Sequence, residues 1–422
     1  MAHVTDDRQR YLEVQGDWHN AEDTFWLNVY ERSVMAPSLA IHTSPRTQLL
    51  VDLKALPHEN DATKHVVEMT KRESNWIELQ VKQPHEQALR SVFQAPNKEL
   101  TCGDGLFALD VSPDEHYVVA GGRHGGCTVW NIGQATKHVQ LSGHMMDVTS
   151  ARFFPSSKVV LTGSLDFKLR IWSVDNGRCA AVLEGHLGGI EDTVIVGRGR
   201  NVLSCGSDGL IQLWSCGSQQ GIAKWATDDR SAVHCMSLLT DGSLCAPKTL
   251  SPDAEEFETD DKVLFAGLDN GEVLGVDIRA RESVANIDVG GAVLSCATAV
   301  VHGVPMLVTG TEKGIVSSWD LRHTQAPLSV VSRSTAEVRH VMLDHVNQLE
   351  NGTPGVWTAH GDGACSYWHG LLSQKPSPRI VTDLTGPTYE PVRRLAMGPR
   401  TGRVFTACRD GQVREYIPHV SV

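Results

Sequence analysis

Short runs in which apolar and polar positions alternate recur along the chain, and they predict β-strands rather than helices. In residues 159–172 (VVLTGSLDFKLRIW), an apolar run and small residues lead to a tight turn at Asp166, and an alternating run then ends in Trp172. Residues 201–214 (NVLSCGSDGLIQLW) have the same layout. Both segments are therefore predicted to be β-hairpins.

The same frame occurs seven times along the sequence. The repeats end at Trp130, Trp172, Trp214, Val276, Trp319, Trp368 and Tyr416. Most of these positions are about 40–50 residues apart, close to the period of a four-stranded propeller blade. Five repeats have glycine at the turn, where positive φ is needed: Gly209, Gly271, Gly314, Gly363 and Gly411. The second repeat has Phe167 there, so we expect a different turn type. The pattern predicts an all-β, seven-bladed β-propeller.

The repeat frame also divides the chain. Residues 1–85 do not fit it and are expected to form a small β-rich N-terminal appendage, whereas residues 86–422 form the propeller. Too few residues follow Tyr416 to complete the seventh blade, so we expect residues 87–93 (QALRSVF) to supply its outer strand and close the ring. An acidic insertion in blade four, residues 245–261, is expected to be a solvated loop.

Charge and composition narrow the class of partner. The net charge of −12 argues against nucleic acid or an anionic membrane and favours a basic partner. Apolar runs fall short of the roughly 20 residues that a membrane helix needs, and the acidic residues near the start do not fit a signal peptide. The ten cysteines include no C-x-x-C pair. We therefore expect reduced thiols, in the cytoplasm, or in the nucleus as well.

Blades two and three each contain a Gly-His pair at the same distance before the closing Trp. In this respect the sequence resembles the WD-repeat family. The resemblance implies a structural set of hydrogen-bonded side chains in each blade, formed by His, a hydroxyl two residues before the turn Asp, that Asp, and Trp. In blade two the set is His144, Ser164, Asp166 and Trp172. Blade three offers His186, Asp208 and Trp214, with Gly206 at the hydroxyl position.

A Ser, a His and an Asp in one cluster also describe a hydrolase triad. We favour the structural interpretation because the groups recur at blade spacing and because a buried indole N–H needs a partner. The sequence contains no phosphate-binding loop, no H-E-x-x-H and no G-x-S-x-G elbow. It therefore predicts no catalytic residues, no metal site and no cofactor, and a protein that is not an enzyme.

Carboxylates on one face of the ring are the candidate partner-binding residues. They lie in loops that lead into the first strand of each blade: Asp104, Asp147, Asp192, Asp228, Asp229, Glu337 and Glu390. Gathered on one face, they would attract a protein surface rich in Lys and Arg. Ordinary solvated charge is the alternative interpretation.

A more specific resemblance covers most of the chain. Residues 143–173, 185–217 and 391–416, with the start at 17–27, are similar to the proteasomal ATPase-associated factor family of WD-repeat proteins. The resemblance implies a non-enzymatic assembly chaperone, monomeric when free, that binds the C-terminal domain of one base ATPase during assembly of the proteasome regulatory particle. The alternatives are a WD-repeat scaffold or substrate receptor of another complex, such as a ubiquitin ligase, and a propeller enzyme.

Overall fold

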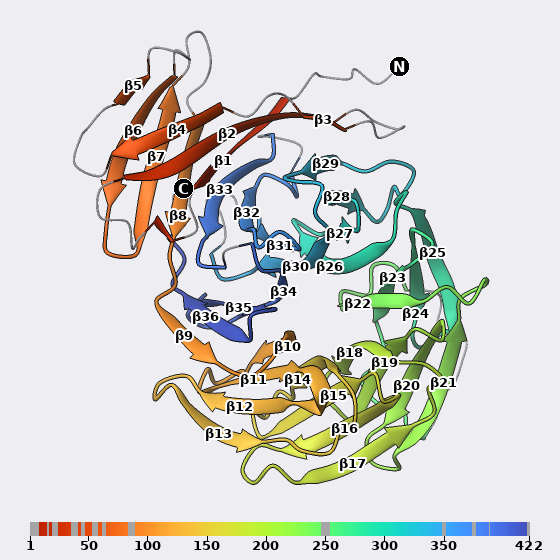
Figure 1. Ribbon diagram of the computed structural model, residues 1–422. Helices are drawn as coiled ribbons and strands as arrows, with labels where there is room; N and C mark the ends of the chain where they lie inside the picture. Colours follow the sequence, from red (N-terminus) through yellow and green to blue (C-terminus); the bar gives the residue numbers. More distant parts are fainter. Residues whose placement is uncertain are drawn as a thin grey trace.

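The strands from residue 98 onward surround a central axis, and the N-terminal strands lie at one side of this ring (Figure 1). The computed structural model describes residues 8–14, 17–18, 24–34, 41–43, 47–52, 58–60, 65–82, 89–245, 254–347, 352–373, 377–387 and 389–419. No helix in this described part of the chain is long and apolar enough to cross a membrane.

Four consecutive antiparallel strands make up each regular sheet of the ring. In one sheet, β14 (Val148–Phe153), β15 (Val159–Ser164), β16 (Lys168–Ser173) and β17 (Cys179–Glu184) pair in chain order. Strand β15 buries all but its first residue, whereas the outer strand β17 alternates between exposed and buried positions. The sequence shows the same contrast, because a strand covered on both faces carries a continuous apolar run and a half-exposed strand alternates.

Four further sheets repeat this order. The first blade consists of β10 (Leu106–Val111), β11 (Tyr117–Gly122), β12 (Cys127–Asn131) and β13 (Thr136–Gln140). The third blade consists of β18 (Ile190–Val196), β19 (Asn201–Gly206), β20 (Leu210–Ser215) and β21 (Gln220–Ala226). The fourth blade consists of β22 (Val233–Leu239), β23 (Val263–Leu268), β24 (Glu272–Asp277) and β25 (Glu282–Asp288). The fifth blade consists of β26 (Val293–Val301), β27 (Val304–Thr311), β28 (Ile315–Asp320) and β29 (Ser329–Ser332).

A larger mixed sheet takes the next place in the ring. It begins with β30 (Val338–Asp344), β31 (Gly355–His360), β32 (Cys365–His369) and β33 (Arg379–Leu384). The first strands of successive sheets contact one another from β10 through β30 to β34 (Val392–Met397), and β34 contacts β10. The predicted all-β propeller is confirmed, with six regular four-stranded blades and this mixed sheet.

The strand that closes the ring differs from the predicted one. Residues 87–93 do not complete the last blade, because β8 (Leu89–Gln94) pairs in parallel with β33 in the mixed sheet. Instead β9 (Lys98–Thr101) pairs antiparallel with β36 (Gln412–Tyr416), next to β35 (Val404–Cys408). Only a short connection separates β8 from β9, so consecutive strands join neighbouring sheets. A strand that precedes the first blade still closes the ring, but it lies further along the chain than expected.

The N-terminal strands add a second layer beside the mixed sheet (Figure 1). One sheet contains β1 (Arg8–Val14), β2 (Thr24–Val34), β3 (Ile41–Thr43) and β4 (Thr47–Asp52). The mixed sheet continues beyond β8 through β7 (Trp76–Lys82), β6 (His65–Arg72) and β5 (His58–Asn60).

A small apolar core joins these strands to the ring. Leu12 and Leu27 pack in one buried cluster with Ile77 and Phe93. The indole Nε1 of Trp18 donates a hydrogen bond of 3.0 Å to Thr385 Oγ1, in the segment that follows β33. The N-terminal segment therefore packs on the propeller, which its sequence did not indicate.

The C-terminal half of the acidic insertion is held against the third regular blade. The backbone N–H of Phe257 donates to Asn201 Oδ1 at 2.6 Å, and the N–H of Arg198 donates to Glu258 Oε2 at 2.6 Å. The expectation of a solvated loop is therefore wrong for this half, because its backbone and side chains bond to the ring. Residues 246–253 of the insertion lie outside the described part of the chain.

Candidate functional site

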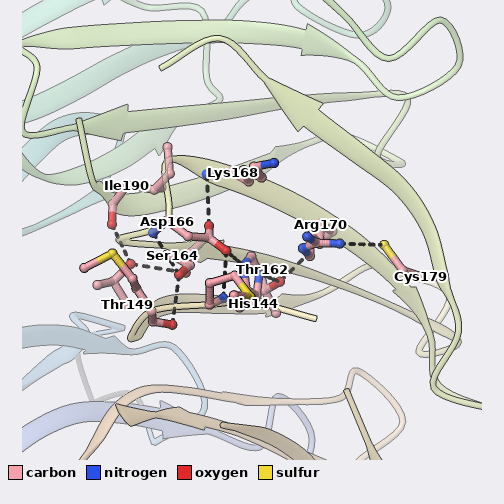
Figure 2. A network of polar contacts seen from close by, with 12 residues as sticks. His144, Thr149, Thr162, Ser164, Asp166, Lys168, Arg170, Cys179 and Ile190 are labelled. Carbon is pink, nitrogen blue, oxygen red and sulfur yellow. Dashed lines mark hydrogen bonds and ion pairs between the residues drawn. The ribbon is translucent and has the colours of Figure 1, made fainter. Parts of the chain in front are cut away.

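Four side chains of the second blade form a chain of hydrogen bonds, and three of them, His144, Thr162 and Asp166, are labelled in Figure 2. His144 Nδ1 lies 2.9 Å from Asp166 Oδ2, and His144 Nε2 lies 2.7 Å from Thr162 Oγ1. The indole Nε1 of Trp172 donates to the same Thr162 Oγ1 at 2.8 Å. The set connects the loop before β14, the strand β15, the turn after it and the strand β16.

The order of donors follows from the groups themselves. A carboxylate only accepts, so His144 Nδ1 carries the proton that bonds to Asp166, and Nε2 accepts from Thr162. Burial lowers the pKa of His144 more than the neighbouring Asp166 carboxylate raises it. The imidazole is therefore neutral near pH 7. Desolvation disfavours the Asp166 carboxylate, but hydrogen bonds from His144 and from the backbone N–H groups of Met145 and Lys168 lower its pKa overall.

The third blade repeats the arrangement. His186 Nδ1 lies 2.9 Å from Asp208 Oδ2, and His186 Nε2 lies 2.8 Å from Ser204 Oγ. Trp214 Nε1 donates to Ser204 Oγ at 2.8 Å. Burial lowers the pKa of His186 as it does in the second blade. Two neighbouring blades therefore carry the same complete set.

The hydroxyl of each set is not the one expected. We expected Ser164 in blade two, yet its Oγ donates to the backbone carbonyl of Met146 at 3.1 Å. Trp172 lies opposite Val160 in the β15–β16 register, so its indole reaches diagonally to Thr162, on the same face of β15. Ser164 lies two residues further along that face, beyond the indole.

The corresponding expectation for blade three was that Gly206 leaves the set without a hydroxyl. It is wrong for the same reason, because Trp214 lies opposite Val202 and reaches Ser204. The signal in the sequence was a hydroxyl two residues after the position that faces Trp. That signal also accounts for a bond in a blade without the Gly-His pair, where Trp319 Nε1 donates to Thr309 Oγ1 at 3.3 Å.

The geometry does not match a hydrolase triad. His144 bonds to Thr162 and not to Ser164, and the side chains of Thr162 and Ser164 are both fully buried, with 0% exposure. A nucleophile needs space beside it for a substrate. Within the described residues, no three His, Cys, Asp or Glu side chains are grouped so that they could hold a metal ion.

The sets fix the loops above them. Besides bonding to His144, the Asp166 carboxylate accepts the backbone N–H of Met145 at 3.1 Å. In the next blade, the Asp208 carboxylate accepts the backbone N–H of Leu187 at 2.8 Å. Each Asp thereby joins a turn to the loop that leads into a first strand. We call the face formed by these loops and turns the rim face.

Four of the seven acidic candidates are exposed on the rim face: Asp104, Asp228, Asp229 and Glu390. Asp104 has 77% of its side chain exposed and lies 3.9 Å from Arg123 Nη1. An exposed pair at this distance is weak, so it leaves the carboxylate accessible to a partner.

Asp147 and Glu337 also lie in rim loops, but both are half-buried. Asp147 Oδ1 accepts the backbone N–H of His124 at 2.9 Å, and Glu337 Oε1 accepts from Arg339 Nε at 2.8 Å. The guanidinium of Arg339 therefore offsets the charge of Glu337, and partial burial makes Asp147 less accessible than the four exposed acids.

Asp192 does not belong to the rim. Only 2% of the residue is exposed, and its Oδ1 accepts from Arg394 Nη2 at 2.7 Å and from Arg152 Nη2 at 3.4 Å. These residues lie on β18, β34 and β14, the first strands that surround the central axis. The expectation is wrong because β18 already begins at Ile190, so Asp192 lies within the inner strand.

Known proteins share the repeat and most of the chain. Residues 94–131, 135–173 and 177–215 match the family model for the WD domain, G-beta repeat. The chain is 31% identical over 191 residues to 26S proteasome regulatory subunit RPN14 of Saccharomyces cerevisiae. It is 31% identical over 208 residues to proteasomal ATPase-associated factor 1 of Gallus gallus. These two matches cover 44% and 49% of this chain, and they span a little under half of each relative, 46% and 45%.

The human relative matches along nearly its whole length. The chain is 30% identical over 430 residues to proteasomal ATPase-associated factor 1 of Homo sapiens, which covers 96% of this chain and 98% of that protein. A match of this extent includes the N-terminal strands and the mixed sheet as well as the regular blades. This chain, which contains WD repeats, therefore belongs to the family of proteasomal ATPase-associated factor 1.

Proposed function

We propose that this protein is a non-catalytic assembly chaperone that binds the C-terminal domain of one proteasomal base ATPase through its rim face. The observation that carries the proposal is the match of 96% of the chain to a proteasomal ATPase-associated factor. The name of that relative supplies the class of partner. The similar protein of Saccharomyces cerevisiae is named as a regulatory subunit of the 26S proteasome, which agrees with that class.

The charge of the chain supports a basic partner surface. The net charge is −12, and the rim loops expose Asp104, Asp228, Asp229 and Glu390. A carboxylate face raises the rate of encounter with a surface rich in Lys and Arg and favours one orientation of the complex. In this proposal the four exposed acids are the main charged contacts, with Asp147 and Glu337 at the margin.

The proposed mechanism is occlusion. A rigid ring covers a surface of the free ATPase that a later assembly partner needs, and the chaperone leaves when that partner docks. Because a ligand shifts an equilibrium only by its differential affinity, the chaperone has only to bind the unassembled ATPase more tightly than the assembled one. This activity requires no cofactor and takes place where proteasomes assemble, in the cytoplasm or the nucleus.

The proposal includes a division of the chain. Strands β30–β33 act as the seventh blade, so residues 86–422 form the propeller and residues 1–85 the appendage. Support comes from β30, which contacts the first strand on either side as the other inner strands do. The appendage packs through Trp18 and Leu12 beside this blade. Met145 and Leu187, in the rim loops of blades two and three, remain exposed.

A binding experiment tests the function. The full chain is titrated by calorimetry with the isolated C-terminal domain of each base ATPase in turn. We expect one of them to form a one-to-one complex whose affinity falls as salt rises. Glu390→Lys and Asp228→Lys should each weaken that complex several-fold, mainly by slowing association.

A matched charge reversal provides the control. Asp175 is exposed in the turn between β16 and β17, at the opposite end of the strands from the rim turns. Asp175→Lys should leave the affinity unchanged, although it alters the net charge by the same amount. If no ATPase domain binds, and the chain instead recovers cullin-associated proteins from cell extract, the proposed function is wrong.

A further inference from the structure

Four large apolar side chains are exposed close together on the rim face. Met145 and Leu187 are each 82% exposed, Met146 is 49% exposed and Phe167 is 46% exposed. Met145 and Met146 lie in the loop before β14, Phe167 in the turn after β15, and Leu187 in the loop before β18. We call these four residues the apolar rim patch.

Backbone contacts hold the three segments of the patch side by side. The N–H of Leu165 donates to the carbonyl of Asp147 at 3.0 Å, which joins the turn of Phe167 to the methionine loop. The Leu165 side chain also lies against Gly189, where an added Cβ would come within 2.6 Å of Cδ2. The apolar side chains therefore rise from one continuous stretch of the rim.

The buried hydrogen-bond sets hold two of these residues in place. The N–H groups of Met145 and Leu187 donate to Asp166 and Asp208, whose carboxylates are fixed by buried histidines. A partner that contacts Met145 or Leu187 therefore need not order the loop first, which reduces the entropy lost on binding.

The backbone of Phe167 adopts a conformation that is unfavourable for nearly every residue type except glycine. Its φ is 71°, in the left-handed region, at the turn position where Gly209 has a φ of 70° and Gly411 a φ of 80°. The expectation of a different turn type is therefore wrong, because Phe167 adopts the conformation of the glycine turns. A side chain at such a φ is strained, and glycine is not. Because 46% of Phe167 is exposed, burial inside the chain offsets only part of that strain. Strain retained for an exposed aromatic side chain suggests a role in binding.

Charge next to the patch indicates the chemistry of its occupant. Asp147 follows Met146 directly in the chain. The exposed Asp228 and Asp229 lie in a loop that is joined to the turn between β19 and β20, because the N–H of Thr227 donates to the carbonyl of Gly209 at 3.0 Å. Arg230 in the same loop is also exposed, but the acids outnumber it. An apolar centre bordered mainly by carboxylates fits a protein surface whose apolar side chains are surrounded by Lys and Arg.

We infer that the apolar rim patch is the central anchor for that surface, on the same ATPase C-terminal domain to which the proposed function assigns the rim acids. This inference rests on the proposed function and adds the residues that supply most of the affinity. Exposed aromatic and methionine side chains at the centre of an interface contribute more than the charged residues at its edge. Phe167 and Met145 therefore act as anchors, and the carboxylates orient the partner.

The test uses the full chain and the ATPase domain that binds it most tightly. Phe167→Gly removes the anchor and restores the residue that the turn prefers, so we expect affinity to fall about tenfold or more. The melting temperature should stay the same or rise by about 1–2 °C. A residue with only a structural role would not lower affinity while leaving stability intact.

Two further variants and a control complete the design. Met145→Ser and Leu187→Ser leave the backbone bonds in place and should also weaken binding several-fold. Val300 is 43% exposed on β26, next to the hairpin that leads into β27, so Val300→Ser is the matched loss of an exposed apolar side chain away from the rim. Val300→Ser should bind like the wild type.

The outcomes separate the two proposals. If the wild type binds an ATPase domain and all three patch variants bind equally well, the anchor inference is wrong and the proposed function stands. If the wild type binds no ATPase domain, both are wrong. If the wild type self-associates in sedimentation experiments and Phe167→Gly abolishes this, the patch joins two copies of the chain, and its assignment to an ATPase is overturned.

Discussion

Thr162 connects two polar groups that have no other access to water, so its hydroxyl can be tested directly. Its Oγ1 accepts from Trp172 Nε1 at 2.8 Å and bonds to His144 Nε2 at 2.7 Å, and the residue is 0% exposed. Thr162→Val keeps the shape of the side chain and removes only the oxygen. The indole N–H and the imidazole nitrogen then remain buried without a partner.

The expected magnitude follows from these two lost bonds. A buried polar group left without a partner costs about 1–3 kcal/mol, and two groups in one network give about 2–5 kcal/mol in the free energy of unfolding. Ser164→Ala provides the comparison, because Ser164 bonds to the carbonyl of Met146 and accepts the N–H of Asp166, both at 3.1 Å. Those partners lie beside an exposed turn, so we expect a loss of about 1 kcal/mol.

Urea unfolding followed by circular dichroism measures both free energies. The exchange rate of the Trp172 indole proton gives a local readout, since it should rise in Thr162→Val and stay slow in Ser164→Ala. If Ser164→Ala destabilises the chain as much as Thr162→Val does, or if the indole proton exchanges equally slowly in both, Thr162 is not the shared hydroxyl of the set.

Three other predictions concern stability. Burial lowers the pKa of His144 and of His186 in the folded chain, so the unfolded chain takes up these two protons first as the pH falls. The stability that these two residues contribute should therefore be lost progressively below pH 6.5, as melting curves recorded between pH 7.5 and pH 5 would show. Asp192→Asn should lower the free energy of unfolding in urea by about 3–5 kcal/mol, because Arg394 keeps a buried charge without its carboxylate. Leu100→Asp should lower the melting temperature and increase light scattering on heating, because it puts a charge into the buried side of the closing strand β9.

The sequence was sufficient to predict the blades because each repeat marks both its strands and the turn between them. Glycine at Gly209 and Gly411 marks turns that the structure holds at positive φ, and apolar alternation marks the strands on either side. The closing strand was harder to predict. Both β8 and β9 are short strands that precede the first blade, and only the three-dimensional path of the chain decides which of them pairs with β36.

The candidate site was only partly predictable. The equal spacing of His144 and His186 showed that two blades repeat, and the resemblance to the WD-repeat family supplied the sets. The choice between Thr162 and Ser164 depended on cross-strand register, because both lie on one face of β15. Asp192 was misplaced because a β-bulge between Ile190 and Asp192 starts the inner strand inside what looks like a loop. Charge alone did not distinguish a rim carboxylate from one in the ring interior.

The apolar rim patch gave a weak signal in the sequence. Phe167 stood out as a departure from the glycine turn, but its exposure became evident only in the folded chain. Met145 and Leu187 each follow a conspicuous His, and a single apolar residue in a loop has no periodicity that would assign it to a surface. The backbone bonds to Asp166 and Asp208 show why these two side chains point outward.

The central claim is that the rim face binds a proteasomal base ATPase. Hydrogen–deuterium exchange on the full chain, with and without the ATPase C-terminal domain, tests it most directly. We predict slower exchange in residues 141–147, 164–168, 185–190 and 227–232, and no change in the hairpin at 301–304 on the opposite face. Slower exchange confined to that hairpin and to other turns of its face, with the rim loops unaffected, would contradict the claim.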